Sequence, residues 1–556
     1  MMKATILDWA ILTDRIRALS SINPKLEPIL TFAKGSPERA AVDESVKRQW
    51  NHVEEIPCIV GGKEIFSGNT YEEVAPFDHG HAIDTVHLAD KAIINDAIRA
   101  AMTARRSWEA TPLEERVKIF LKAADLISGK YRAELLAAAM ITQGKTVFQA
   151  EIDIICELAD FYRMHAKFAL DMLQQIQPES TDTIKNSLVF RGMEGFIAAV
   201  APFNFTAIGG NLAGTPALMG NVVLWKPSFS NTLPNYKIFR ILEEAGVPPG
   251  VLNFVPCRGP TLGDAIVASP DLACVNFTGS SGTFQTMWKD IGNNVHRYKT
   301  WPKLIGECGG KNYHLISPSA DVANAVNNTI RSAFEFGGQK CSACSRMYVP
   351  ESLWPSVKEG LVEACKEMKV DSPLDHSTFF SAVINKKSFD KITGYIDEAN
   401  KSSSVKTVTG GKYDGSKGYF VEPTIYECED PHDKLMEEEI FGPIVGAYIY
   451  PDNKYKEVLD LIAETSPYAL TGAVFAQDEK VIEETHAALK DTAGNFYIND
   501  KSTGAVVTSS RLVVQEHQLS VIHPTPVGDP LTDIGDPPTA IADPPTAIAD
   551  PPHSYR

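Results

Sequence analysis

The sequence predicts an α/β protein with two domains, each built on a parallel sheet that helices cover. Short apolar segments begin at residues 195, 221, 251 and 274, and stretches with helical spacing separate them. This alternation is typical of βαβ units in a doubly wound sheet. It resumes after residue 318, and 556 residues are enough for two or three domains with sizeable cores. We therefore expect a second α/β domain after the first.

Each element follows from a local pattern. Apolar side chains recur at helical spacing over residues 93–175, which predicts helices there. A helix is also expected at 230–246, capped by Ser230 and ended by Gly246. After 318, we expect a helix that runs through Phe336. The remaining expected elements are strands at 195–202, 221–227, 251–257, 274–280 and 346–350, and a helix at 353–368.

Composition narrows the class of protein. The chain is 44% hydrophobic and 22% charged, as is ordinary for a soluble protein, and its formal net charge is −17. Nucleic-acid binding needs a basic surface, so the charge argues against that function. No apolar run is long enough for a predicted membrane span. Nine cysteines at irregular spacing indicate a reducing compartment and mostly packing cysteines.

The two ends of the chain differ from the rest. Residues 1–30 carry Lys3, Arg15 and Arg17 with an amphipathic pattern, but also acidic residues, which targeting segments usually lack. A targeting role for this extension therefore stays open. Residues 535–552 repeat a unit rich in proline and aspartate. Proline at this density prevents helix and sheet, so we predict disorder there.

Two thiols stand three positions apart in FEFGGQKCSACSR, residues 334–346. Zinc normally needs a second such pair, and a redox pair usually opens a helix after a strand. Cys341 instead follows a glycine turn, where backbone N–H groups can approach the sulfur and dipoles can favour the thiolate. A nucleophile is the better interpretation of Cys341, and a packing role is the better interpretation of Cys344.

Polar residues at predicted strand ends offer further chemistry. Glu307, in LIGECGGKN, is either a satisfied strand-end group or a general base with a raised pKa. The Asn204 amide in PFNFT can donate to a developing oxyanion. Gly279 and Ser280 join a strand to a helix, which is either an ordinary turn or a pyrophosphate site. Lys226 ends a neighbouring strand, where ligands bind in open α/β sheets.

Six motifs in order resemble the aldehyde dehydrogenase superfamily over roughly residues 31–506. They are PFNFTAIGGNLAGTPALMGNVVLWKPS, FTGS, GECGGKN, GGQKCSACSR, EEEIFGP and AGNFYINDKSTG. The residues in these motifs are similar to those of family members that oxidise L-glutamate 5-semialdehyde, derived from 1-pyrroline-5-carboxylate, to L-glutamate in proline catabolism. The resemblance implies NAD as cofactor, a cysteine thiohemiacetal and thioester, and the mitochondrial matrix, with the cytoplasm as the alternative location.

The resemblance also implies roles for individual residues. Cys341 matches the nucleophile, Glu307 the general base and Asn204 the oxyanion amide. The residues that match cofactor contacts are Pro202, Lys226, Gly279, Ser280, Glu439 and Phe441. The residues that match substrate contacts are Phe205 as an aromatic wall, Ser342, Gly504, Ala505 and, more weakly, Glu157 near the substrate ammonium. No metal is implied.

The superfamily's organisation implies a Rossmann-like NAD-binding domain over 31–312, with a protruding oligomerisation hairpin at 182–195, and a catalytic domain over 313–506. It also implies homodimers or higher oligomers. The match stops after KSTGAVV: a G-x-Q-P-F-G-G segment and a terminal strand are missing, and Ala505 replaces a serine. Residues 507–556 form an unrelated tail. The alternative function is therefore an impaired form that keeps NAD binding and acts as an interaction protein.

Overall fold

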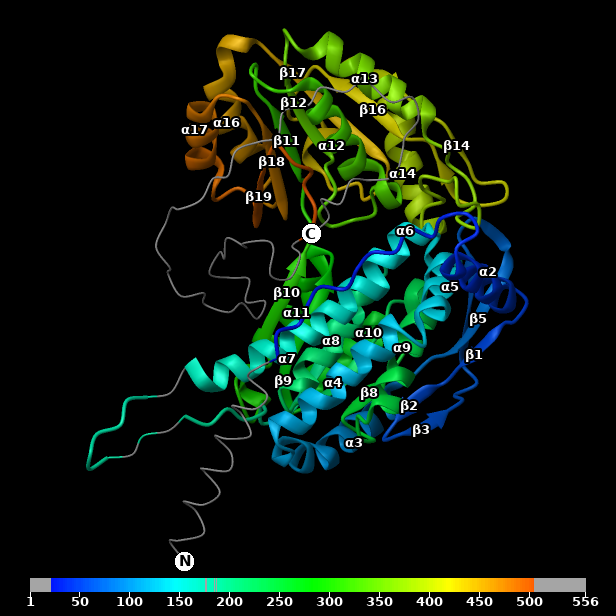
Figure 1. Cartoon of the computed structure of the whole chain (residues 1–556), viewed down its shortest axis with the longest axis vertical. Helices are drawn as coiled ribbons and strands as arrows, with labels where there is room; N and C mark the ends of the chain where they lie inside the picture. Colours follow the sequence, from blue (N-terminus) through cyan, green and yellow to red (C-terminus); the bar gives the residue numbers. More distant parts are fainter. Residues whose placement is uncertain (1–21, 176–177, 185, 187, 505–556) are drawn as a thin grey trace, which may run out of the picture.

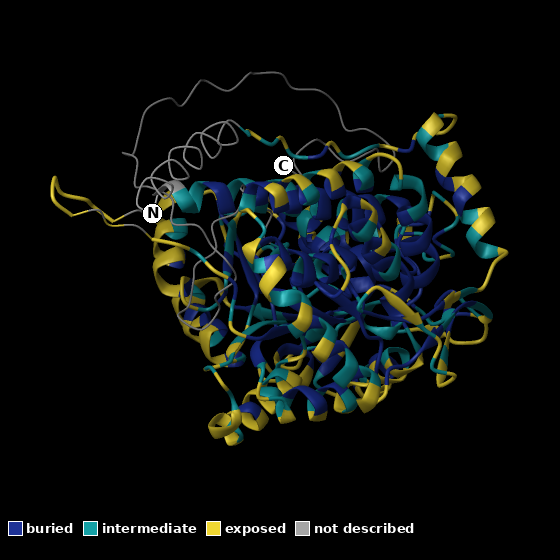
Figure 2. Ribbon diagram, turned by 90° about the horizontal axis from the view of Figure 1, so that it is seen from below, coloured by how far each residue is buried: buried dark blue, intermediate teal, exposed yellow. Residues whose placement is uncertain are grey.

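The computed structural model describes residues 22–175, 178–184, 186 and 188–504, and these form two α/β lobes, one above the other in Figure 1. Each lobe has a seven-stranded sheet at its centre. The central strands of both seven-stranded sheets are buried, and many helices show exposed outer faces (Figure 2).

The sheet of the first lobe has the order β10-β9-β6-β7-β8-β2-β3. Its strands are β2 (Cys58–Val60), β3 (Lys63–Ile65), β6 (Phe196–Val200), β7 (Val222–Lys226), β8 (Leu252–Phe254), β9 (Leu272–Gly279) and β10 (Lys303–Cys308). The five strands from β10 to β8 are parallel, while β2 and β3 are antiparallel additions. Every residue of β6 is buried, which explains its continuous apolar sequence. Because these five strands are parallel, their carboxyl ends meet at one edge of the sheet.

Helices of the first lobe surround this sheet. They are α2 (Pro37–Trp50), α3 (Lys91–Ala110), α4 (Leu113–Ser128), α5 (Arg132–Gln143), α6 (Val147–Ala150), the π-helix η1 (Glu151–Glu157), α7 (Leu158–Gln175), α8 (Thr206–Leu218), α9 (Thr232–Ala245), α10 (Gly259–Ala268) and α11 (Ser281–Asn293). The helical prediction for 93–175 is confirmed. A separate sheet, β1-β5-β4, was not predicted, because its strands are partly exposed and carry no continuous apolar run. Its strands are β1 (Glu54–Ile56), β4 (Thr70–Ala75) and β5 (Asp78–His87).

The sheet of the second lobe has the order β13-β16-β17-β12-β11-β18-β19, with antiparallel β13 at one edge. Its strands are β11 (Tyr313–Ile316), β12 (Arg346–Pro350), β13 (Val405–Thr409), β16 (Thr424–Cys428), β17 (Ile444–Tyr450), β18 (Thr471–Phe475) and β19 (Asn495–Ile498). Its helices are α12 (Val322–Phe334), α13 (Trp354–Glu367), α14 (Lys386–Ala399), α15 (Lys434–Glu437), α16 (Tyr455–Thr465) and α17 (Glu479–Leu489). A small pair, β14 (Tyr413–Asp414) and β15 (Phe420–Val421), completes the lobe.

Two local predictions were wrong. Ser230 does not cap a helix: it lies in a 3₁₀ turn, and α9 begins after Asn231. Helix α12 ends at Phe334 because Phe336 adopts a left-handed conformation, with φ of 55°, inside the 3₁₀ turn η4 (Glu335–Gly338).

The segment at 182–195 projects from the body in Figure 1. Its described residues contain no strand, and residues 185 and 187 lie outside the description, so the oligomerisation hairpin stays a prediction.

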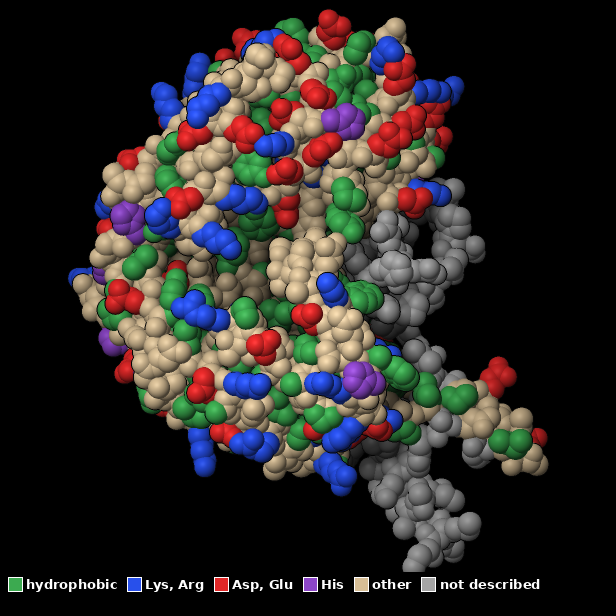
Figure 3. All heavy atoms as spheres, turned by 180° about the vertical axis from the view of Figure 1, so that it is seen from behind, with side chains coloured by type: hydrophobic (Ala, Val, Ile, Leu, Met, Phe, Trp, Pro, Cys, Tyr) green, Lys and Arg blue, Asp and Glu red, His purple; other side chains and the backbone are tan. Residues whose placement is uncertain are grey.

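The surface carries both signs of charge. On the face shown in Figure 3, the coloured basic and acidic side chains are interspersed and form no broad basic area. No helix among residues 22–175, 178–184, 186 and 188–504 is both long and apolar enough to cross a membrane.

Candidate active site

The turn that carries Cys341 lies between η4 and β12 and is held by one side chain, Asn312. The Asn312 Nδ2 donates to the carbonyls of Cys341, at 2.7 Å, and Ala343, at 2.9 Å. Its Oδ1 accepts from the backbone N–H groups of Leu470 and Thr471, both at 2.9 Å. Asn312 thus connects this turn to β18. We call the turn the nucleophile turn, after the predicted role of Cys341. Sequence analysis missed this residue, although it stands in the GECGGKN motif.

The two neighbouring thiols have different surroundings. Cys341 is half-buried, whereas Cys344 is buried and its Sγ donates to the Arg346 carbonyl at 3.5 Å. The Cys344 N–H donates to Ser332 Oγ at 3.0 Å. All nine cysteines lie in the described residues and are free thiols. Cys341 is therefore the more accessible of the two thiols, and Cys344 is part of the packing of the second lobe.

Carboxylates converge on Cys341 from both lobes. Burial raises the pKa of the Cys341 thiol well above its usual range, and the charges of Glu307, Glu439 and Glu157 raise it further. The Cys341 backbone N–H lowers this pKa, as expected of a nearby dipole, but burial and the carboxylates outweigh it. Burial also raises the pKa of Glu307, in β10. A thiol that stays protonated needs a base, and a carboxylate with a raised pKa is suited to be one.

Asn204 connects the turn after β6 to the nucleophile turn. Its side chain is buried, and its Nδ2 donates to the Gln339 carbonyl at 3.1 Å. Gln339 is in turn fixed because its Oε1 accepts from the Ile384 N–H at 2.8 Å. The Asn204 amide thus contacts the turn that carries Cys341 at Gln339, two residues before Cys341.

The carboxyl edge of the first sheet carries the predicted cofactor residues. Lys226 ends β7, and its Nζ donates to the Pro227 carbonyl at 2.9 Å. Gly279 ends β9, and Ser280 caps α11 by accepting from the Thr283 N–H at 3.4 Å. A Cβ at Gly282, in the first turn of α11, would meet no atom within 4 Å. A cation, a helix N-terminus and open space therefore meet at one edge, which fits a dinucleotide.

The second lobe contributes Glu439 and Phe441 to this edge. A Cβ at Gly309 would lie 1.9 Å from Glu439 Oε1, so only glycine there permits the observed position of the carboxylate. Burial raises the pKa of Glu439. The Phe441 ring meets the Phe203 ring edge-on, with centroids 5.7 Å apart, and Pro202 lies half-buried in the same turn as Phe203.

The predicted substrate residues come from several other elements near the turn that carries Cys341. Phe205 is the residue before α8, and Lys145 Nζ lies 4.6 Å from the centre of its ring. A Cβ at Gly504 would lie 4.0 Å from Ser342 Oγ. Glu157 ends the π-helix η1, and burial, followed by the charge of Asp153, raises its pKa to about 8. Ala505 and the tail after it lie outside the described residues.

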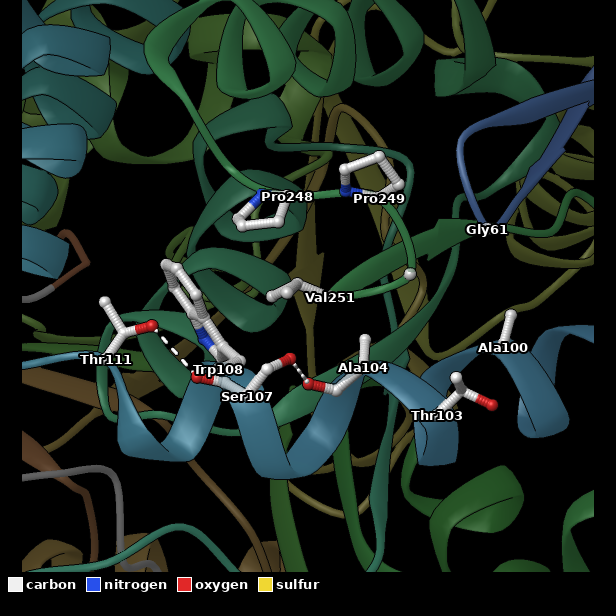
Figure 4. A pocket seen from close by; sticks show the side chains of 11 residues that line it. Gly61, Ala100, Thr103, Ala104, Ser107, Trp108, Thr111, Pro248, Pro249 and Val251 are labelled. Atoms are coloured by element: carbon white, nitrogen blue, oxygen red, sulfur yellow. Dashed lines mark hydrogen bonds between the residues drawn. The ribbon is translucent and has the colours of Figure 1, made fainter.

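A hollow elsewhere on the first lobe is not part of this site. Figure 4 shows it between α3 and Pro248–Val251. Residue 251 precedes β8, so the hollow lies at the amino-terminal edge of the parallel strands, opposite the edge where ligands bind. The Ser107 and Thr111 hydroxyls in it already donate to carbonyls of α3.

Comparison with known proteins identifies the class. The profile described as the aldehyde dehydrogenase family matches residues 65–510. This chain belongs to the aldehyde dehydrogenase family. The inferences of an α/β aldehyde dehydrogenase fold and of this superfamily are confirmed.

Particular relatives are also similar over most of the chain. Delta-1-pyrroline-5-carboxylate dehydrogenase, mitochondrial, of Danio rerio is 54% identical over 488 residues, 88% of each chain. The protein of the same name from Homo sapiens is 53% identical over 494 residues, 89% of this chain and 88% of that one. A crystal structure of the Delta-pyrroline-5-carboxylate dehydrogenase from Mycobacterium tuberculosis bound with NAD has a TM-score of 0.85 at 40% identity, covering 88% of this chain and 90% of that one.

Proposed function

We propose that this protein oxidises L-glutamate 5-semialdehyde, the open form of 1-pyrroline-5-carboxylate, to L-glutamate with NAD, as a step of proline catabolism. The proposal rests on one observation: Cys341, Glu307 and Asn204 lie near one another, next to the carboxyl edge of the first sheet, where a dinucleotide would fit. The relatives named above support the choice of substrate and of cofactor. Their mitochondrial names support a location in the mitochondrial matrix.

The reaction starts at Cys341. Glu307 accepts the thiol proton, directly or through water, as the sulfur attacks the aldehyde carbon and forms a thiohemiacetal. The raised thiol pKa means that deprotonation accompanies attack, and the raised pKa of Glu307 strengthens it as the acceptor. Once the acyl group is held on Cys341 as a thioester and Glu307 has released the thiol proton to solvent, Glu307 activates the water that hydrolyses the thioester to the acid and the free thiol.

Charge on the aldehyde oxygen is stabilised by two donors, the Asn204 amide and the Cys341 N–H. A single donor of this kind contributes about 3–4 kcal/mol to lowering the barrier. In the present structure the Asn204 amide donates to the Gln339 carbonyl, which keeps it directed toward the nucleophile turn. A substrate oxygen there replaces or shares that acceptor.

The cofactor edge holds NAD through groups that the fold already presents. Lys226 and Glu439 would hold the ribose hydroxyls, Gly279 and Ser280 would contact the pyrophosphate, and Pro202 and Phe441 would provide further cofactor contacts. When bound, NAD supplies the acceptor for the hydride that leaves the thiohemiacetal carbon.

The substrate carries an ammonium, a carboxylate and an aliphatic chain, and the pocket offers a group for each. The residues that would contact these groups are Phe205 for the chain, Glu157 for the ammonium, and Ser342 and Gly504 for the carboxylate, whereas Ala505 lies outside the described residues. We also infer that the projecting segment at 182–195 contacts a second copy of this chain in a homo-oligomer.

The test is NAD reduction by the purified full chain with 1-pyrroline-5-carboxylate, compared with propanal, together with calorimetry of NAD binding. We expect NAD binding and a higher kcat/KM for 1-pyrroline-5-carboxylate than for propanal. Oxidation of propanal alone would refute the substrate. NAD binding without any turnover would favour the impaired form, and a chimera in which residues 506–556 carry the usual ending of the family would locate that defect.

A further inference from the structure

The turn that carries Asn204 and Phe205 is hydrogen-bonded to a residue far away in sequence. Gln143, at the end of α5, donates from Nε2 to the Phe203 carbonyl at 2.6 Å. Its Oε1 accepts from Thr206 Oγ1 at 3.2 Å. These two bonds flank the Asn204–Phe205 pair, so the position of that pair depends on residues that never touch the reacting atoms.

Asp153 caps the N-terminus of α8, because the residue before this helix has no side chain that can do so. The residue before α8 is Phe205, which has no side-chain capping bond. Asp153, from the π-helix, accepts from the Thr206 N–H at 3.0 Å and from the Ala207 N–H at 2.9 Å. Free N–H groups and a partial positive charge at a helix start favour a carboxylate there. Asp153 therefore fixes the backbone directly after Asn204.

Lys145 joins this cap to the opposite turn. Its side chain is 1% exposed, and its Nζ donates to Asp153 Oδ2 at 2.5 Å. The same Nζ lies 4.6 Å from the centre of the Phe205 ring and 4.8 Å from that of Phe336. Phe336 is the left-handed residue of η4, just before the nucleophile turn. One buried ammonium thus contacts both segments that carry reacting groups.

We propose that Lys145 and Asp153 are positioning residues, which set the place of the Asn204 amide relative to Cys341. The inference rests on the proposed function, since it assigns Asn204 to the oxyanion. A π-helix turn is also common at functional sites, and here it carries Asp153.

A double-mutant cycle tests whether the pair acts through Asn204. Lys145→Gln and Asp153→Asn are measured alone and in the Asn204→Ala background, with propanal and 1-pyrroline-5-carboxylate. We expect each single variant to lower kcat about 10- to 100-fold, less than the roughly 100- to 1000-fold loss for removing an oxyanion donor outright, with the NAD Kd unchanged. In the Asn204→Ala background the further loss should stay below about threefold. Additive losses would overturn the proposal. Lys145→Arg, which keeps the charge, should recover most of the lost kcat.

Hydrogen exchange gives a readout that does not need activity. In Asp153→Asn, at least one of the Thr206 and Ala207 amides should exchange about tenfold faster than in the wild type, because asparagine offers one acceptor oxygen where aspartate offers two. The matched control is Asp171→Asn, which breaks a Lys167–Asp171 pair of 2.8 Å on α7, away from the site. Unchanged exchange in Asp153→Asn would overturn the proposal even in a protein without turnover. If only propanal is oxidised, the substrate assignment fails while the cycle still decides this inference. If Asp153→Asn does not fold, Lys145→Gln, which retains the Asp153 cap, carries the kinetic cycle, and additive losses there would overturn the proposal.

Discussion

Replacing Asn312 with alanine should destabilise the protein and loosen the nucleophile turn. The side chain is 1% exposed and makes four hydrogen bonds, two to carbonyls of the turn and two from N–H groups at the start of β18. Alanine leaves these four backbone groups without that partner. A buried group left unsatisfied costs about 1–3 kcal/mol, so the low end predicts a loss of about 4 kcal/mol in the free energy of unfolding.

Urea unfolding and alkylation of Cys341 measure the two consequences. We expect a lower unfolding midpoint and faster modification of Cys341 by iodoacetamide, because the half-buried thiol becomes more exposed. The matched control is Asn328→Ala, which removes only bonds to Asn324 within α12 and should cost less than about 1 kcal/mol. The reasoning fails if Asn312→Ala unfolds within 1 kcal/mol of the control and the Cys341 alkylation rate does not change.

The remaining predictions concern the thiols, the cofactor edge and acid stability. Cys341→Ala should abolish turnover while NAD binding survives, and Cys344→Ala should keep most activity; equal losses in steady-state assays would contradict the single nucleophile. Gly309→Ala should displace the Glu439 carboxylate and weaken NAD binding, whereas Gly292→Ala, where a Cβ meets nothing within 4 Å, should leave the calorimetric Kd unchanged. Burial lowers the pKa of His314 to about 3, below its unfolded value of about 6.5, so its share of stability is complete above pH 6.5 and is lost as pH falls toward 3. Between pH 7 and pH 5, His314→Gln should therefore lose about 2 kcal/mol less than the wild type in urea unfolding, and an identical loss would show that His314 does not stay neutral.

The sequence by itself predicted the parallel strands of the first sheet and offered candidates for the reacting residues. Strands such as β6 are buried on both faces, so they need continuous apolar side chains, which the sequence shows directly. Cys341, Glu307 and Asn204 became candidates because each follows or ends such a strand, or a glycine turn, and the resemblance to the aldehyde dehydrogenase superfamily then favoured a catalytic role for each. Residues whose role depends on local backbone geometry can be read in this way.

Only the tertiary structure decided which side chains hold these groups in place and which charges shift their pKa values. Asn312 and Asp153 act on turns far away in sequence, and nothing in their neighbours' spacing indicates which backbone groups they meet. The raised pKa of the Cys341 thiol comes from burial and from carboxylates on other elements, which reversed the expectation from its own turn. Desolvation and Coulomb interactions depend on distance in space, and only folding brings these segments together.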